Sequence, residues 1–148
     1  MDTDRTNGES RLVDAPLTDK VIGVFYDVYN ELGSGFLESV YENAFCIALR
    51  DAGLEVAQQV PLDVRFRRSI VEQFRVDLLV ASRLVVEVKA VSQIVKAHET
   101  QLVNYLKATG YNVGLLVNFG QRPQFKRRIF NMSYPCSSAL IRVEKNVR

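Results

Sequence analysis

Two segments near the start of the chain carry apolar side chains at helical spacing. In residues 17–32 and again in residues 37–52 the apolar positions recur every three or four residues, which is the pattern of an amphipathic helix. On the second segment one face would carry Leu37, Val40, Tyr41, Ala44, Ala48 and Ala52. Gly33 and Gly53 follow the two segments, as expected after helix ends. The sequence therefore predicts two helices, and the polar residues 1–16 before them are interpreted as a flexible tail.

The next part of the chain alternates apolar and polar residues, which is the period of a β-strand. Residues 56–66 and 70–80 carry their apolar side chains at even positions and are separated by a polar turn at residues 67–69. They form a predicted hairpin, with Pro61 interrupting its first strand. Residues 84–90 are rich in valine and predict a third strand that is covered on both faces.

Helical spacing returns in residues 96–108, and an apolar segment follows Gly110 at residues 112–118. These segments predict another helix and a fourth strand. A further strand around residues 128–130 is left open, and the last fifteen residues are left unassigned. The predicted elements thus follow in the order ααβββαβ, which indicates an α/β fold.

Composition narrows the class of protein. The chain has 148 residues, of which 47% are apolar and 24% charged, and these values fit a single globular domain and exclude the disordered class. The sequence contains no apolar run of transmembrane length and no apolar signal core at its start. We therefore expect no membrane association and a cytoplasmic location. Cys46 and Cys136 are too few for a disulfide framework and are interpreted as free thiols.

The charge is distributed unevenly along the chain. Residues 1–60 hold 4 Lys and Arg against 11 Asp and Glu, whereas residues 61–148 hold 15 against 6. A basic second half suggests a polyanionic partner. Its basic residues include two clusters, formed by Arg65, Arg67 and Arg68 and by Lys126, Arg127 and Arg128. A solvated surface explains these clusters about as well as a nucleic-acid contact does.

Three charged residues on two predicted strands suggest chemistry. Asp77 lies at an odd position of its strand, away from the even apolar face, and Glu87 and Lys89 share one face of the next strand because they are two residues apart. The two carboxylates, with the backbone carbonyl of Val88, would supply oxygen ligands for Mg²⁺ or Mn²⁺. Lys89 could offset charge that develops on a phosphate. An ordinary ion-pair cluster on a sheet is the alternative.

The helices supply further polar residues. Glu38 and Tyr41 lie about one turn apart after Gly35, which permits close approach of the backbone at a helix start. Gln101 and Tyr105 are four residues apart and share a helix face. His98 is the sole histidine; we interpret it as a solvated helix position and not as a metal ligand.

At these residues the sequence resembles a known family. Gly35, Glu38 and Tyr41 match the signature of the GxxExxY protein family, a branch of the PD-(D/E)xK nuclease-like superfamily. The other motifs of the resemblance lie in residues 75–80, 86–90, 101–106 and 114–120. Val76 stands where the superfamily name has proline.

The resemblance implies a mixed sheet flanked by helices, in a restriction-endonuclease-like αβββαβ core with an extra N-terminal helix. Residues 17–131 would form this domain, and residues 132–148 would be a C-terminal extension. It also implies site residues. Glu38, Asp77, Glu87, Lys89 and Gln101 would be catalytic, Asp77 and Glu87 with the Val88 carbonyl would bind metal, and Gly35, Tyr41 and Tyr105 would support them. The implied function is Mg²⁺-dependent hydrolysis of DNA, with Mn²⁺ as a substitute metal.

The sequence leaves other functions open. A non-catalytic module of the same fold would use the basic clusters to bind nucleic acid without cleaving it. A part in a defence system, a homodimer and a protein partner also stay open, because fold alone does not determine function.

Overall fold

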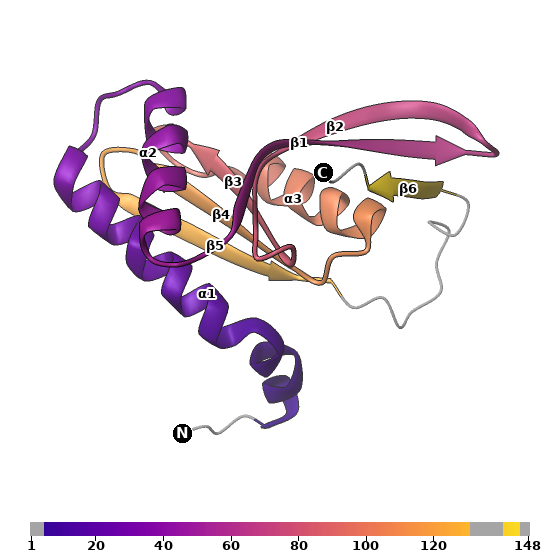
Figure 1. Cartoon of the computed structure of the whole chain (residues 1–148), viewed down its shortest axis with the longest axis horizontal. Coiled ribbons are helices and arrows are strands. Elements are labelled where there is room, and N and C mark those ends of the chain that lie inside the picture. Colours follow the sequence, from indigo (N-terminus) through magenta and orange to yellow (C-terminus); the bar gives the residue numbers. More distant parts are fainter. Residues whose placement is uncertain (1–4, 131–140, 146–148) are drawn as a thin grey trace.

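The computed structural model describes the backbone of residues 5–130 and 141–145 and the side chains of residues 14–130. Its helices are α1 (Arg5–Leu32), α2 (Glu38–Asp51) and α3 (Lys96–Thr109). Its strands are β1 (Val56–Phe66), β2 (Ser69–Val80), β3 (Leu84–Lys89), β4 (Val113–Phe119), β5 (Pro123–Ile129) and β6 (Ile141–Lys145). The predicted αβββαβ core runs from α2 to β4 and is confirmed, with α1 as the extra N-terminal helix (Figure 1).

The described strands form one mixed sheet in the order β5-β4-β3-β2-β1-β6. Only the β3–β4 pair is parallel within this sheet. Parallel neighbours need a long crossover connection, and α3 supplies it. The hairpin of β1 and β2 is long and extends away from α1 and α2 (Figure 1). This topology places β3 and β4 in the interior of the sheet.

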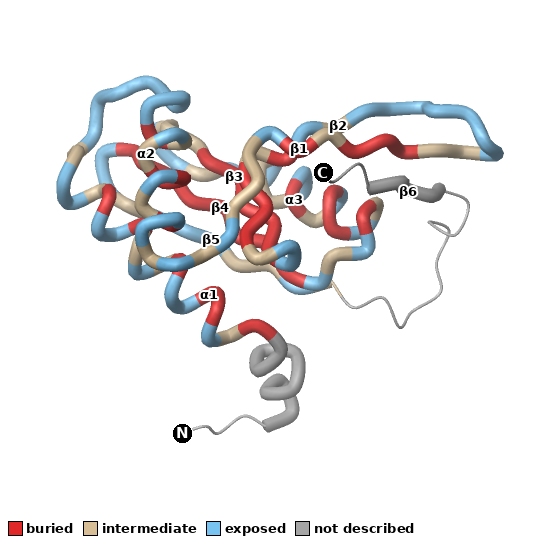
Figure 2. The backbone as a smooth tube through the Cα atoms, in the orientation of Figure 1, coloured by how far each residue is buried: buried red, intermediate tan, exposed pale blue. Residues whose placement is uncertain are grey.

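Helices cover both faces of β3 and β4. On one face α1 and α2 pack over a cluster that contains Phe25, Phe45 and Phe119, which are at most 1% exposed. On the other face α3 packs through Leu102 and Leu106, both fully buried. Buried backbone accordingly runs along the central strands (Figure 2). The valine-rich composition of residues 84–90 correctly predicted a strand covered on both faces.

The predicted tail is wrong for residues 5–16, because α1 begins at Arg5. The helix is broken at Asp14, whose φ of −135° and ψ of 27° are not helical. Asp14 is anchored there: its carbonyl accepts a hydrogen bond from Thr18 Oγ1 (2.8 Å) and its carboxylate pairs with Arg83 (2.9 Å). Pro16 falls in the first turn after the break, where a helix tolerates proline. Without an apolar stripe, the first part of α1 gave no periodic signal.

The predicted apolar face of α2 is also wrong in part. Tyr41 is buried as predicted, together with Phe45, Cys46 and Leu49. Leu37 and Val40 are exposed, Leu37 to 76%. Apolar residues occur on several sides of this helix, so their spacing alone did not select the side that meets the sheet.

The even positions of β1 and β2 do not share one face, and Pro61 does not interrupt β1. Leu78 packs in the cluster under α1 and α2, whereas Val76 packs in the cluster under α3. The face changes where Gln59 has a positive φ of 54°. Left-handed backbone within a strand turns the chain locally, so the predicted alternation fails at this point.

The C-terminal part of the chain contains more strand than expected. β5 begins at Pro123, five residues before the strand left open at 128. β6 lies within the predicted extension 132–148 and pairs with β1, so part of that extension belongs to the sheet of the domain. The rest of the predicted extension, including Cys136, lies outside the described residues.

Candidate active site

Asp77 and Glu87 meet where β2 and β3 part. The register of the two strands runs from Val80↔Leu84 to Leu78↔Val86; Asp77 and Glu87 are the next residues outward. The backbone amide of Asp77 lies 3.4 Å from Glu87 Oε2, and the backbone amide of Val88 donates to Asp77 Oδ2 (2.8 Å). At the point where the two strands diverge, the Asp77 carboxylate accepts the hydrogen bond of the Val88 amide, a position that strand backbone would otherwise occupy. This point, with Asp77 and Glu87, is called the fork below. The fork holds two carboxylates in fixed positions.

Val88 and Lys89 complete the strand end at the fork. In an extended strand the amide and carbonyl of one residue point to the same side, so the Val88 carbonyl faces the side from which Asp77 approaches. Lys89 is half-buried and shares the face of Glu87, and its register partner on β4 is Asn118. The structure therefore brings Asp77, Glu87, the Val88 carbonyl and Lys89 together, while their roles in metal binding and catalysis stay predictions.

The surroundings of the fork disfavour the charged forms of Asp77 and Glu87. Burial raises the pKa of Glu87 well above its ordinary value, and the neighbouring Asp77 carboxylate raises it further, while the Asp77 amide and Lys89 act in the opposite direction. Burial also raises the pKa of Asp77, against a lowering effect of the Val88 amide. Glu87 is only 5% exposed. A buried carboxylate pair of this kind is stabilised by a bound cation.

Helix α2 brings two further acidic residues, Glu38 and Glu42, near the fork. Glu38 is exposed at the first position of the helix, and Glu42 is half-buried one turn later. The charges of both raise the pKa of Asp77, with the larger effect from Glu42. Glu38 was predicted as a site residue and Glu42 was not, although its spacing of four residues from Glu38 on one helix was a signal for it.

Gln58 and Gln59 connect this helix to the fork and were also missed. The Gln59 amide nitrogen lies 2.9 Å from Glu42 Oε2 and 3.3 Å from Asp77 Oδ1. The Gln58 amide nitrogen also donates to Glu42 Oε2 (2.9 Å). The positive φ of Gln59 aims its side chain in this way, and such backbone strain persists where the surroundings fix it. No apolar pattern could have predicted it.

Tyr41 and Gly35 shape the start of α2. The Tyr41 hydroxyl donates to the Gly33 carbonyl (2.5 Å) and accepts from the Phe36 amide (3.2 Å). Its buried ring stacks on Phe119 with centroids 4.5 Å apart. Gly35 has a φ of +111°, where glycine is strongly preferred. In this arrangement Gly35 and Tyr41 position the chain that leads into Glu38.

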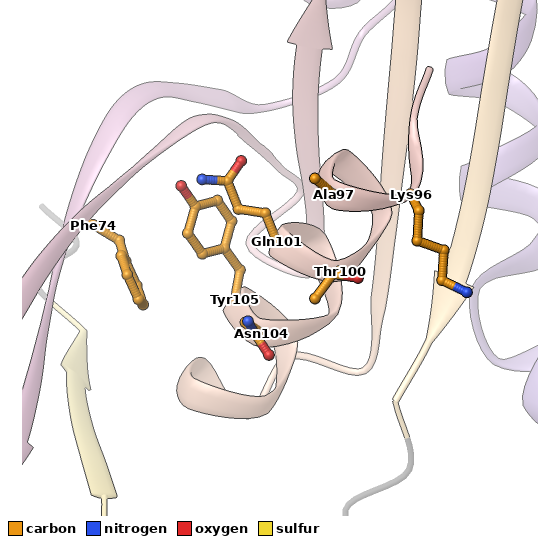
Figure 3. Close-up of a pocket in the computed structure, with 7 residues that line it drawn as sticks. All are labelled: Phe74, Lys96, Ala97, Thr100, Gln101, Asn104 and Tyr105. Carbon is orange, nitrogen blue, oxygen red and sulfur yellow. The ribbon is translucent and has the colours of Figure 1, made fainter. Parts of the chain in front are cut away.

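Helix α3 places Gln101 and Tyr105 beside a cavity of about 580 Å³, which Phe74 of β2 closes on one side (Figure 3). Tyr105 is 7% exposed, and its ring centroid lies 4.8 Å from that of Phe74. Burial, followed by the charges of Glu87 and Asp77, raises the pKa of Tyr105 to about 12. Its hydroxyl therefore stays protonated at neutral pH and is within electrostatic reach of the fork. Gln101 is exposed and points to the same side as the Tyr105 hydroxyl (Figure 3).

A side-chain clamp fixes the connection from β3 to α3. Asn118, fully buried on β4, accepts from the Val91 amide (2.8 Å) and donates to the Val91 carbonyl (2.9 Å). A Cβ at Gly120 would lie 2.2 Å from that carbonyl, so only glycine fits beside it. Gly114 likewise leaves room for Leu102 of α3. Gly114, Asn118 and Gly120 therefore fix the position of β3 relative to α3, and with it that of Lys89 relative to Gln101.

His98 and Cys46 lie outside this site. His98 is half-buried, and its Nδ1 accepts a hydrogen bond from the Val95 amide (3.2 Å), so it caps α3 and is more than a solvated position. Cys46 is a buried free thiol, and burial raises its pKa. Neither residue has a place in the chemistry of the fork.

The first basic cluster lies at the tip of the long hairpin. Arg67 and Arg68 form its two-residue turn and have φ values of 50° and 73°. Both are exposed, and Arg67 lies over the ring of Phe66 at 5.0 Å. Arg65 is half-buried and donates to the Arg68 carbonyl (3.4 Å). The hairpin carries these arginines away from the helices (Figure 1).

The second basic cluster lies on β5, at the other side of the sheet. Lys126 is exposed and Arg127 is half-buried. Arg128 forms an ion pair with Glu99 of α3, so part of its charge is already compensated. Three strands separate β5 from β1 in the sheet order. The structure therefore does not join the two predicted clusters into one surface.

The described part of the chain has neither a clustered set of metal ligands nor a membrane-spanning helix. In residues whose side chains are placed, no group of three or more His, Cys, Asp and Glu residues has the arrangement of a metal site. No described helix is both long and apolar enough to cross a membrane. Among the described residues, the groups at the fork that could bind a metal are the two carboxylates and backbone oxygen.

Comparison with known proteins assigns most of the chain to a family. A family model described as the PD-(D/E)XK nuclease superfamily matches residues 15–129, which include all the site residues of α2, β2, β3 and α3. No curated protein and no solved structure matched the chain. Membership of the GxxExxY branch, based on Gly35, Glu38 and Tyr41, stays a prediction. The matched segment covers most of the chain, and the protein therefore belongs to the PD-(D/E)XK nuclease superfamily.

Proposed function

We propose that the protein is a Mg²⁺-dependent nuclease that hydrolyses phosphodiester bonds in DNA. The observation that carries the proposal is the fork of β2 and β3, where the carboxylates of Asp77 and Glu87 lie together. Lys89 shares the face of Glu87 and lowers its pKa. A nuclease-type function is also what the superfamily supports.

The residues at the fork fit a hard divalent cation. Asp77 and Glu87 offer carboxylate oxygens, and the Val88 carbonyl offers a third. Mg²⁺ is usually bound by one or two carboxylates together with substrate phosphate and water, so a set of two carboxylates is sufficient. Mn²⁺ accepts the same oxygen ligands. The raised pKa values of both acids indicate that a cation at this position would relieve unfavourable charge.

Each group at the fork has a distinct task in hydrolysis. A water oxygen forms the new bond to phosphorus, and the bond from phosphorus to the leaving sugar oxygen breaks. A bound cation would lower the pKa of water and polarise a phosphoryl oxygen. Lys89 offsets negative charge on the phosphate. Glu38, whose charge acts on Asp77, would supply a further acceptor, and Gln101 on α3 would supply donor and acceptor groups from the cavity.

The basic clusters support DNA as the substrate. Arg67, Arg68 and Lys126 are exposed, and exposed cations bind phosphate with release of counterions. Arg65, Arg127 and Arg128 are half-buried and would contribute less as free charges. A cytoplasmic location and a homodimer or protein partner stay predictions.

The proposal is tested by cleavage and by metal binding in parallel. Purified protein is incubated with plasmid and linear DNA in Mg²⁺, Mn²⁺ or chelator, and Mn²⁺ binding is followed by calorimetry. The double variant Asp77→Ala, Glu87→Ala should lose both cleavage and Mn²⁺ binding. A matched double variant, Asp51→Ala, Glu55→Ala, removes two exposed carboxylates outside the fork and should retain both.

Two results would decide against the proposal. Unchanged Mn²⁺ binding by the Asp77 and Glu87 double variant would place the metal elsewhere. DNA binding without cleavage in every metal would indicate the non-catalytic module instead.

A further inference from the structure

The cavity beside α3 is built differently from the fork. Phe74 and Tyr105 form an aromatic wall at one end, with ring planes tilted by 53°. Thr100, Gln101 and Asn104 line the cavity along the exposed side of the helix, and Lys96 lies at its far end, directed away from Phe74 (Figure 3). The described lining contains no carboxylate. The cavity therefore combines an aromatic surface with neutral polar groups, and the Lys96 ammonium points away from them.

These groups match the base of a nucleotide. Aromatic side chains stack on the faces of unpaired bases, and this interaction tolerates any base because every base has a π-face. A side-chain amide carries both donors and an acceptor, as the edges of bases do. A volume of about 580 Å³ is within the range of sites that enclose a small organic ligand.

The cavity adjoins the fork. Tyr105 closes the cavity and also lies within electrostatic reach of Glu87 and Asp77. Phe74 precedes Asp77 by three residues on β2. A base held against Phe74 would therefore belong to a nucleotide close to the phosphate that reaches the fork.

We propose that this cavity holds one unpaired base of a nucleic-acid strand next to the phosphate that faces Asp77 and Glu87. The proposal rests on the proposed nuclease function and narrows its substrate to single-stranded nucleic acid, including single-stranded segments of a duplex. A base within an intact duplex is paired and stacked, so it must be extracted before it can enter the cavity. Intact duplex should therefore fill the cavity poorly.

Binding in chelator tests this proposal without depending on cleavage. The full chain is titrated with a labelled single-stranded DNA 12-mer, the same strand as RNA, the same sequence as duplex, and the DNA strand with one abasic site scanned along it. At equal salt we expect single strands to bind about tenfold tighter than duplex, and one abasic position to weaken binding about five- to tenfold, as expected when one base no longer stacks on an aromatic ring. The DNA and RNA arms identify which strand is preferred.

Variants connect the effect to the cavity. Phe74→Leu keeps an apolar side chain but removes the aromatic face, and it should weaken single-strand binding about fivefold while abolishing the penalty of the abasic site. It should also reduce the quenching of a 2-aminopurine placed at that position. Phe125→Leu, which alters an exposed aromatic residue on β5, is the matched control and should change neither. Asn104 is exposed, so the variant Asn104→Ala should fold normally. It should reduce the differences in affinity among strands that place different bases in the cavity.

The results separate this proposal from the nuclease proposal. Strand binding that depends on Phe74 without cleavage would contradict only the nuclease function. Cleavage with equal binding of single strand and duplex, or an abasic penalty unchanged by Phe74→Leu and Asn104→Ala, would overturn the base site while the nuclease function stands.

Discussion

The two faces of β3 are covered by helices in different ways. Val86 and Val88 point into the cluster under α1 and α2, where Phe25, Phe45 and Phe119 are almost completely buried. Glu87 and Lys89 point to the side of α3, which covers the sheet with a single helix and leaves the fork and the cavity beside it. Alternate residues of one strand can therefore serve stability on one face and chemistry on the other.

The largest expected effect concerns the face under α1 and α2. Phe25→Ala should lower the free energy of unfolding by about 3–5 kcal/mol, because a fully buried aromatic side chain is removed and a cavity remains. Chemical denaturation measures this. The neighbouring Tyr26→Ala removes a ring that is 36% exposed and should cost much less. Equal losses in the two variants would show that the apolar face is not the main source of stability.

A substitution of Lys89 tests the face of β3 on the side of α3. Lys89→Ala should reduce the cleavage rate by about two orders of magnitude, the usual loss for one charge-stabilising group, while DNA affinity and melting temperature change little. Lys107→Ala removes an exposed lysine of α3 and serves as the control. A Lys89 variant that melts early, from a parent that never cleaves DNA, would assign Lys89 to a structural ion pair and remove the enzyme assignment.

The raised pKa of Glu87 predicts a pH dependence of stability without metal. As the pH rises above the ordinary value of 4.5, the unfolded chain loses this proton before the folded chain does, so stability falls until the pH passes the raised pKa of the folded state. Glu87→Gln should remove this fall and be the more stable protein at neutral pH in chelator. Thermal melts across the acid to neutral range measure it. A parent that gains as much stability over that range as Glu87→Gln would contradict the prediction.

Gln59 allows a smaller and sharper test at the fork. Gln59→Gly accepts the positive φ without strain but removes the amide between Glu42 and Asp77, so Mn²⁺ affinity should fall about tenfold, as expected for loss of one hydrogen bond to a charged group. Calorimetry measures the change. Gln58→Ala removes contacts to Glu42 and Asn43 but none to Asp77, and it should retain most of the affinity. Equal affinities in parent and Gln59→Gly would remove Gln59 from the site.

The smallest expected effect is that of substitutions in the basic cluster on β5 on the salt dependence of DNA binding. If Lys126 neutralises one phosphate of duplex DNA, Lys126→Ala should lower the slope of log affinity against log salt by about 0.9. Arg128→Ala should change the slope less, because Arg128 is paired with Glu99. Titrations at several salt concentrations compare them. If all three residues of the cluster are replaced by alanine and the slope is unchanged, DNA binds elsewhere.

Strong periodic signals predicted most of the fold. The hairpin of β1 and β2, the strand β3 and the helix α3 were predicted within a few residues, because apolar spacing reports which side chains face a core. The first part of α1 carries no such spacing. The face of α2 that packs against the sheet was also predicted wrongly in part. Apolar residues lie on several sides of this helix, so tertiary packing decides which side is buried.

Only part of the fork could be predicted from the sequence, and regular strand spacing again decided which part. Asp77, Glu87 and Lys89 could be grouped because they lie on neighbouring strands with a fixed side-chain period. Gln59 could not be grouped with them, because its approach to Asp77 depends on its own left-handed backbone within β1. Glu42 had a signal in its spacing of four residues from Glu38, but its link to Asp77 runs through the same Gln59 side chain. Backbone conformations of this kind depend on the surrounding structure more than on the local sequence.

The double hydrogen bond from Asn118 to Val91 has a consequence for how the chain could vary in length. Since a side chain of β4 holds the start of the connection after β3, the position of Lys89 does not depend on how many residues lead on to α3. We expect residues inserted at the exposed Ser92 and Gln93 to loop outwards while the fork and α3 keep their relation. An insertion between Lys89 and Val91 would instead move the residue that Asn118 holds.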